Sequence, residues 1–143
     1  MISDVTADPA ALANGLRPVL LRLSRELRRE TDPLGVTSRQ VTLLWLIRER
    51  PGLSLRQLAA EERISAPALS GHLDRLERAG LIERVRSTED RRRVGIRLTA
   101  EGSGILKRIR ARRTTWLAER LRHLEPEELA AIEAALGPLQ RLL

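Results

Sequence analysis

The chain has no Phe and no Tyr, and it has only two Trp among its 143 residues. Hydrophobic residues still make up 42% of the sequence, so any buried core must be aliphatic. Leu and Ala supply most of this apolar material, and Arg and Glu are abundant among the polar residues. All four are strong helix formers, so the sequence predicts a mainly α-helical protein. The length fits one domain, or one compact module with helical extensions.

Positive charge is concentrated in the middle of the chain. The formal net charge is +7, and 25 of the 26 basic residues are Arg. Residues 34–98 carry 13 basic and 8 acidic side chains, whereas residues 1–33 carry five of each. Such an excess favours a polyanionic partner, and the guanidinium group can bind a phosphate or a guanine through two parallel hydrogen bonds.

Other compositional features exclude several classes of protein. The chain has no Cys, which removes disulfides, thiolate nucleophiles and thiol redox sensing. The acidic start MISDVTADPA is not a signal peptide, and the apolar stretch Val41–Ile47 is too short to span a bilayer, so we expect a soluble, cytoplasmic protein without a membrane partner. No phosphate-binding Gly loop and no metal-ligand cluster is visible, so we expect no enzyme activity, catalytic residue, metal or cofactor.

Both ends of the chain predict amphipathic helices. Asp8-Pro9 is a good helix start, although Pro18 predicts a kink or a break further on. Leucines then recur at helical spacing and predict a buried stripe: Leu12, Leu16, Leu20, Leu23 and Leu27. The last helix starts at Glu125-Pro126 and carries a second stripe: Leu129, Ile132, Leu136, Leu139 and Leu143. These stripes favour a dimer, and folding back within one chain is the alternative.

The middle of the chain predicts a winged helix-turn-helix. Capping boxes at Thr37-x-x-Gln40 and Ser54-x-x-Gln57 open two helices, and Ser65 caps a third that runs to Ala79. The period then changes, because apolar residues alternate with polar ones over Val94–Leu98, and Ile82–Arg86 can pair with this strand. Thr99 caps the long helix that follows. Two short helices with a tight turn, followed by a basic hairpin, are typical of a winged helix.

The helix that starts after Ser65 is the candidate DNA-reading helix. Its leucines point into the core, and its opposite face has small or polar residues near the N-terminus, which a major-groove helix needs. We predict DNA contacts from this face by Ser65, Pro67, Ala68, Ser70, Gly71 and Arg75. An ordinary amphipathic surface helix is the alternative for this segment taken alone.

The predicted hairpin is the second candidate DNA contact. A carboxylate beside the Arg run at its tip can hold a guanidinium in one orientation, and such an Arg suits the narrow minor groove. The residues that we predict to bind DNA from here are Arg86, Asp90, Arg91, Arg92 and Arg93. A solvated basic loop is the alternative.

The stretch from Leu58 to Gly102 resembles the MarR (multiple antibiotic resistance regulator) family. The resemblance rests on LDRLERAGLIER at 73–84, on Asp90-x-Arg92 and on LTAEG at 98–102, and the flanking helices extend it over nearly the whole chain. It implies a triangular homodimer, with dimerisation helices in 1–33 and 100–143 and a DNA-binding winged helix in 34–99. It also implies that Arg92 enters the minor groove, with Asp90 as its support. Gly71 stands where relatives often carry Arg, which weakens the case for a guanine contact there.

The resemblance therefore implies a transcriptional regulator, expected to be a repressor that binds a pseudo-palindromic operator. A winged-helix module that binds protein instead is the alternative, and it would show no salt-sensitive binding to duplex DNA. Relatives often release DNA when a small, often phenolic, anion binds. The candidate pocket residues are Arg17, Trp45, His72 and Trp116, although core packing is the alternative for the two Trp.

Overall fold

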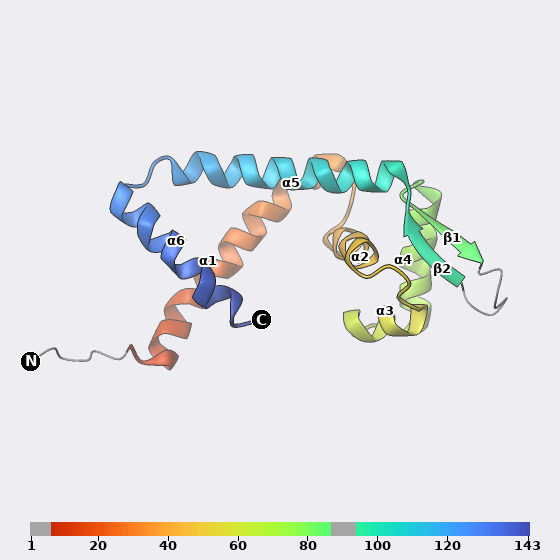
Figure 1. The fold of residues 1–143 in the computed structure, drawn as a ribbon, viewed down its shortest axis with the longest axis horizontal. Coiled ribbons are helices and arrows are strands. Elements are labelled where there is room, and N and C mark those ends of the chain that lie inside the picture. Colours follow the sequence, from red (N-terminus) through yellow and green to blue (C-terminus); the bar gives the residue numbers. More distant parts are fainter. Residues whose placement is uncertain (1–6, 87–93) are drawn as a thin grey trace, which may run out of the picture. The chain divides into compact units, whose positions relative to one another are not determined.

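The computed structural model describes residues 7–86 and 94–143 (Figure 1). Its elements, in chain order, are α1 (Pro9–Arg29), η1 (Asp32–Leu34), α2 (Ser38–Glu49), α3 (Leu55–Glu62), α4 (Ala66–Arg78), β1 (Ile82–Arg86), β2 (Val94–Leu98), α5 (Ala100–Leu121) and α6 (Pro126–Gln140). The predicted fold class, mainly α with a small β-hairpin, is confirmed.

The chain divides into two compact units. Thr31–Ala111 form the first, which we call the winged-helix unit, and the described residues up to Glu30 together with Arg112–Leu143 form the second, the terminal unit. The winged-helix unit includes α5 as far as Ala111, and the functional boundary at residue 99 stays a prediction. Ile105, Leu106 and Ile109, in the first half of α5, are buried in the core of this unit.

The core of the winged-helix unit is aliphatic. Sixteen of the described residues form it, and all are buried: Val36, Val41, Leu43, Leu44, Ile47, Leu58, Ala59, Leu69, Leu73, Leu76, Leu81, Ile82, Ile96, Ile105, Leu106 and Ile109. Trp45 packs against the edge of this cluster and is half-buried. In Figure 1 the hairpin lies beside α4, which β1 contacts, and α2 lies between α3 and the first half of α5.

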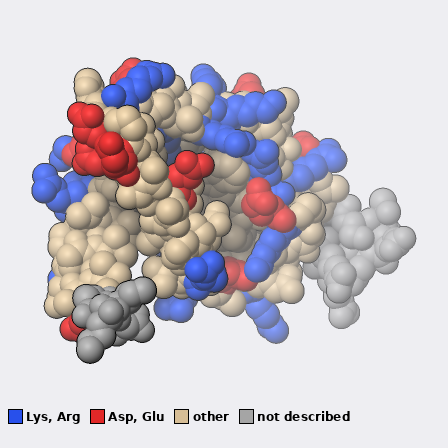
Figure 2. All heavy atoms as spheres, turned by 60° about the vertical axis from the view of Figure 1, so that its left-hand side comes forward, with Lys and Arg blue, Asp and Glu red and all other residues tan. Residues whose placement is uncertain are grey.

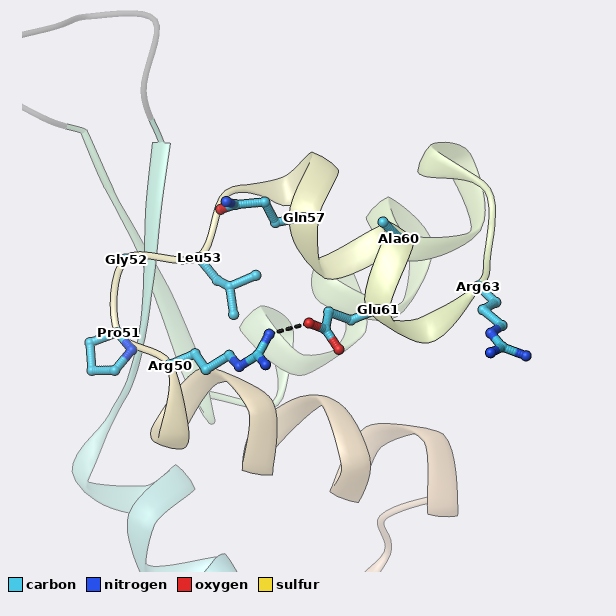
Figure 3. Close-up of a pocket in the computed structure, with 8 residues that line it drawn as sticks. All are labelled: Arg50, Pro51, Gly52, Leu53, Gln57, Ala60, Glu61 and Arg63. Carbon is cyan, nitrogen blue, oxygen red and sulfur yellow. Dashed lines mark hydrogen bonds and ion pairs between the residues drawn. The ribbon is translucent and has the colours of Figure 1, made fainter. Parts of the chain in front are cut away.

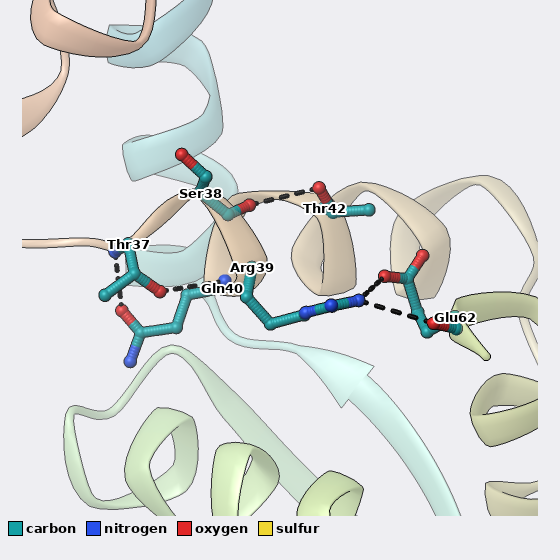
Figure 4. Close-up of polar contacts among 6 residues, drawn as sticks. All are labelled: Thr37, Ser38, Arg39, Gln40, Thr42 and Glu62. Carbon is teal, nitrogen blue, oxygen red and sulfur yellow. Dashed lines mark hydrogen bonds and ion pairs between the residues drawn. The ribbon is translucent and has the colours of Figure 1, made fainter. Parts of the chain in front are cut away.

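Side-chain caps determine where α2 and α3 begin. Thr37 Oγ1 accepts a hydrogen bond from the Gln40 N–H at 3.2 Å, and the Gln40 side chain accepts one from the Thr37 N–H at 2.9 Å (Figure 4). Ser54 and Gln57 form the same pair of bonds at 3.1 and 2.9 Å. Both predicted capping boxes are therefore confirmed. Each one satisfies N–H groups that the first helical turn leaves without a partner.

The hairpin is joined to α5 by a close contact at Gly102. Antiparallel pairing sets Ile82 opposite Leu98. Thr99 donates its hydroxyl to the Gly80 carbonyl at 2.5 Å and accepts the Gly102 N–H at 3.0 Å. A Cβ on Gly102 would lie 2.1 Å from the carbonyl oxygen of Leu81, a distance that no side chain can adopt. The LTAEG motif thus closes the winged-helix unit, with Gly102 where only glycine fits.

The terminal unit has almost no core of its own. α1 and α6 contain no buried residue, and Trp116 in α5 is the one buried residue among those described in this unit. The predicted burial of the α1 leucine stripe is therefore wrong for a single chain: Leu12, for example, is 59% exposed, because no described element of this chain covers it. Figure 2, which turns the side of α1 and α6 forward, shows uncharged surface between charged clusters.

Pro18 does not break the first helix. We predicted a kink or a break at Pro18, and the break is wrong, because α1 is continuous from Pro9 to Arg29 with Pro18 inside it. The kink stays a prediction. A proline removes one backbone N–H from the helical ladder, and the bonds of the neighbouring turns maintain the helix. No described helix is both long and apolar enough to cross a membrane.

Candidate nucleic-acid interface

α4 presents a face of small and polar residues away from the core. Ser65 is its N-cap and accepts a hydrogen bond from the Ala68 N–H at 3.3 Å. The buried side of the helix carries Leu69, Leu73 and Leu76. The predicted DNA-contacting residues are accessible: Ser65, Pro67, Ala68, Ser70 and Arg75 are exposed, and Gly71 is half-buried. The first two turns of α4 therefore have no bulky side chain that would keep the backbone away from a groove.

Arg75 folds back along α4 beside Gly71. Its Nη2 donates to Nδ1 of His72 at 3.2 Å, which requires the ring tautomer with a lone pair on that nitrogen. A Cβ added at Gly71 would lie 3.9 Å from the same Nη2, which is an ordinary contact. Gly71 thus leaves open surface next to the one cation in the middle of this face.

The hairpin is attached to α4 through Arg84, which we did not include among the predicted site residues. Its Nη2 donates to Asp74 Oδ1 at 2.7 Å, and its Nε lies 3.8 Å from Glu77 Oε2. A second ion pair, Arg97 with Glu83, joins β1 and β2. An acid on the outward face of α4 followed by a base in the next strand is the sequence signal that identifies the Arg84 contact, but the signal is common.

The predicted contacts Asp90, Arg91, Arg92 and Arg93 fall outside the described residues. Arg86 ends β1 and is paired in register with Val94.

The four candidate pocket residues are divided between the two units. In the winged-helix unit, the guanidinium carbon of Arg48 lies 5.2 Å from the centroid of the Trp45 ring, and His72 accepts a hydrogen bond from Arg75. In the terminal unit, Arg17 hydrogen-bonds Asn14 on the exposed surface of α1 at 3.4 Å. Trp116 lines a pocket of about 430 Å³, formed by Pro18, Val19, Arg22, Leu23, Glu26, Trp116 and Arg120.

Three charged residues line this pocket: Arg22, Glu26 and Arg120. Arg120 lies over the Trp116 ring, 3.7 Å from its centroid, in a cation–π contact. Farther along the same unit, burial and the neighbouring Arg28 lower the pKa of Arg113, whose Nε donates to the Leu27 carbonyl at 3.3 Å. An arginine starts from so high a pKa that Arg113 keeps its charge at neutral pH.

Across residues 7–86 and 94–143, no three His, Asp or Glu side chains come together as a metal site would require.

Comparison with known proteins agrees with this geometry. The model of the MarR family matches residues 36–94, from the residues before α2 to the start of β2. The HTH-type transcriptional regulator FarR of Neisseria gonorrhoeae is 33% identical over 100 residues, which cover 70% of this chain and 68% of FarR.

Solved structures share the fold over nearly the whole chain. A Pseudomonas aeruginosa protein, whose crystal structure was determined as that of a candidate transcriptional regulator, is 34% identical with a TM-score of 0.82, over 96% of both chains. A MarR family protein from Bacillus stearothermophilus is 27% identical with a TM-score of 0.78, over 92% of both chains. The chain therefore belongs to the MarR family, whose members are DNA-binding transcriptional regulators and not enzymes.

Proposed function

We propose that this regulator is a homodimeric repressor that binds a pseudo-palindromic operator and is released by a small anionic effector. Residues up to 33 and from 100 onward would supply the dimer contacts, and residues 34–99 the DNA-binding surface. The observation that carries the proposal is the exposed, small-residue face at the start of α4, next to a hairpin attached to the same helix. A repressor of this kind acts on chromosomal DNA, so the cytoplasm remains its predicted location.

The face of α4 fits a major groove. Pro67, Ala68 and Ser70 are exposed and short, so the helix backbone can approach base edges closely. We infer that Ser65, Ser70 and Arg75 supply hydrogen bonds there, to phosphate or to base. Gly71 leaves room beside the Arg75 guanidinium, which can then extend from His72 toward the DNA.

The hairpin is positioned to follow α4 onto DNA. Because Arg84 binds Asp74, the direction of the hairpin depends on the helix that enters the major groove. We propose that Arg92 reaches the adjacent minor groove, oriented by Asp90, with Arg86, Arg91 and Arg93 near the phosphates. Arginine in a narrow minor groove benefits from the enhanced negative potential of A·T-rich DNA.

Dimerisation would cover the apolar surface of the terminal unit. The exposed apolar residues of α1 and α6 include Leu20, Leu23, Ile132 and Leu136. Apolar surface of this extent on paired helices is typical of an interface. A two-fold dimer would place two copies of α4 in successive major grooves, about 34 Å apart.

The pocket beside Trp116 is the candidate effector site. The apolar part of its lining suits an aromatic ring, and Arg22 and Arg120, which outnumber the one acid Glu26, suit a carboxylate or phenolate. We keep Arg17, Trp45 and His72 as further candidates, since each lies beside a polar or cationic neighbour.

A genomic footprint followed by one substitution tests this function. The protein should protect two major grooves on one face of a duplex, and Arg92→Ala should weaken operator binding more on A·T-rich than on G·C-rich flanks. Simple phenolic acids, titrated into the complex, should release the DNA. A protein-binding module would instead show no salt-sensitive duplex binding, and equal binding by wild type and Arg92→Ala would remove the hairpin tip from the interface.

A further inference from the structure

Arg63, in the turn between α3 and α4, has a backbone conformation that is unfavourable for any residue except glycine. Its φ of 53° and ψ of 44° lie in the left-handed region, and it is the one non-glycine residue with positive φ in the described parts of the chain. In this region the Cβ of an L-residue crowds the backbone, so glycine is the usual occupant.

The turn at Arg63 can be compared with the turn that ends α4. α3 ends in a Schellman motif, with Ile64 N–H donating to Ala59 O at 3.1 Å and Arg63 N–H to Ala60 O at 3.2 Å. α4 ends in the same motif, through Leu81 to Leu76 at 3.0 Å and Gly80 to Glu77 at 2.9 Å. Gly80 occupies the left-handed position there, with φ of 77°. The fold therefore uses glycine at one of two equivalent turns and arginine at the other.

The space around the two positions differs. A Cβ on Gly80 would lie 3.1 Å from Glu101 Oε2, so a side chain there would be crowded. The Arg63 side chain is exposed, and in Figure 3 it points away from the other labelled residues. Solvent exposure explains why an arginine fits at this turn, although a glycine would be less strained there.

The two acids next to Arg63 are occupied by other arginines. Arg50 pairs with Glu61 (Figure 3), and Arg39 binds both the carboxylate and the carbonyl of Glu62 (Figure 4). Within residues 7–86 and 94–143, no ion pair or hydrogen bond of the Arg63 side chain is present. The positive charge of Arg63 is thus not compensated by Glu61 or Glu62, its nearest acids in sequence.

We propose that Arg63 binds a backbone phosphate of duplex DNA at the edge of the groove that α4 enters. It precedes Ser65, the N-cap of α4, by two residues, a distance of at most about 7 Å along the chain. The backbone phosphates line the groove edges, and the segment before a recognition helix faces them. The proposal rests on α4 as the DNA-reading helix, and a phosphate contact carries no sequence information.

Substitutions at this turn separate the charge from the strain. Arg63→Gly removes both, Arg63→Asn removes the charge while tolerating the left-handed backbone, and Arg63→Lys keeps both. Lys107→Ala is the control for loss of one exposed charge. Lys107 belongs to α5, and in Figure 1 α2 lies between α5 and α3. Each is titrated with a mixed-sequence duplex of about 30 base pairs, between about 50 and 200 mM salt, and melted without DNA.

Arg63→Gly and Arg63→Asn should each bind roughly three- to tenfold more weakly, with the salt slope reduced by about one per bound chain. Arg63→Gly should also melt about 2–4 °C higher, which shows that the loss of binding is not a loss of folding. Arg63→Lys should retain most of the affinity, and Lys107→Ala should keep the wild-type slope. Wild-type binding and slope in Arg63→Gly would overturn the proposal.

The result is distinguishable from failure of the proposed operator recognition. Arg63→Gly should leave the ratio of operator to mixed-sequence affinity unchanged, whereas Arg75→Ala should lower that ratio. If wild type shows no preference for any operator but Arg63→Gly still loses duplex affinity, the phosphate contact stands and the operator model fails.

Discussion

The two units of this chain differ in how many of their apolar residues they bury. Among the described residues, the winged-helix unit places sixteen aliphatic residues in one core, drawn from α2, α3, α4, the hairpin and the first half of α5, together with Val36 before α2 and Leu81 before β1. In the terminal unit only Trp116 is buried among the described residues, although α1 and α6 are rich in Leu. The two units have similar apolar residues available, so the difference lies in whether the same chain supplies a covering surface.

This difference separates two sources of stability. The winged-helix unit has the aliphatic interior and satisfied helix ends of a self-contained fold. The terminal unit leaves large aliphatic side chains exposed to water. Burying apolar surface is favourable by roughly 25 cal/mol per Å², so a partner that covered these side chains would stabilise the unit. We therefore expect association to stabilise the terminal unit, and internal packing to stabilise the winged-helix unit.

The largest effect is expected from charge on the α6 stripe. Leu136→Lys combined with Leu139→Lys should weaken the dimer at least about a thousandfold, because an unpaired buried ammonium is unfavourable by several kcal/mol. Sedimentation should show monomers, with helicity from circular dichroism largely retained. Ala134→Lys, exposed on the opposite side of the same helix, is the matched control and should remain dimeric. A dimer that persists in the double variant would place the interface elsewhere.

A smaller effect, confined to the winged-helix unit, is expected at Gly102. Gly102→Ala should lower the free energy of unfolding by about 3 kcal/mol, since its methyl group would overlap the Leu81 carbonyl. Gly104→Ala, two residues along α5 with nothing within 4 Å of its Cβ, should instead raise stability by about 0.5–1 kcal/mol. Urea unfolding of both variants measures the difference. Equal stabilities would show that the junction can relax, and that this unit is less tightly packed than its geometry indicates.

The smallest effect is expected at the contact between the hairpin and α4. Asp74→Asn should change the free energy of unfolding by less than about 1 kcal/mol, because the ion pair with Arg84 is partly exposed. The variant is more positive, so charge alone predicts tighter DNA binding. Loss of the hairpin orientation predicts binding about three- to tenfold weaker. Glu83→Gln changes the charge equally but leaves Arg84 on Asp74, and should not weaken binding. Tighter binding by Asp74→Asn would show that Arg84 does not position the hairpin.

Much of the fold was predictable because its signals are local. The two capping boxes, the Ser65 cap, Gly80 after α4 and the alternation in β2 each depend on residues only a few positions apart. The outward face of α4 followed from the same logic, because helical geometry determines which residues lie opposite the buried leucines. The hairpin-tip residues Asp90 to Arg93 remain predictions.

The sequence by itself thus determined the helices, the hairpin and the buried face of α4, since these follow from backbone periodicity and capping. Only the tertiary structure decided that Gly102 meets the Leu81 carbonyl, that Arg84 binds Asp74 and that both acids before Arg63 are already paired. It also showed that the described parts of the chain bury none of the leucines of the α1 stripe completely. Each of these depends on whether groups from different elements of the chain come into contact. Periodicity predicts which face of a helix is apolar, but it does not predict what covers that face.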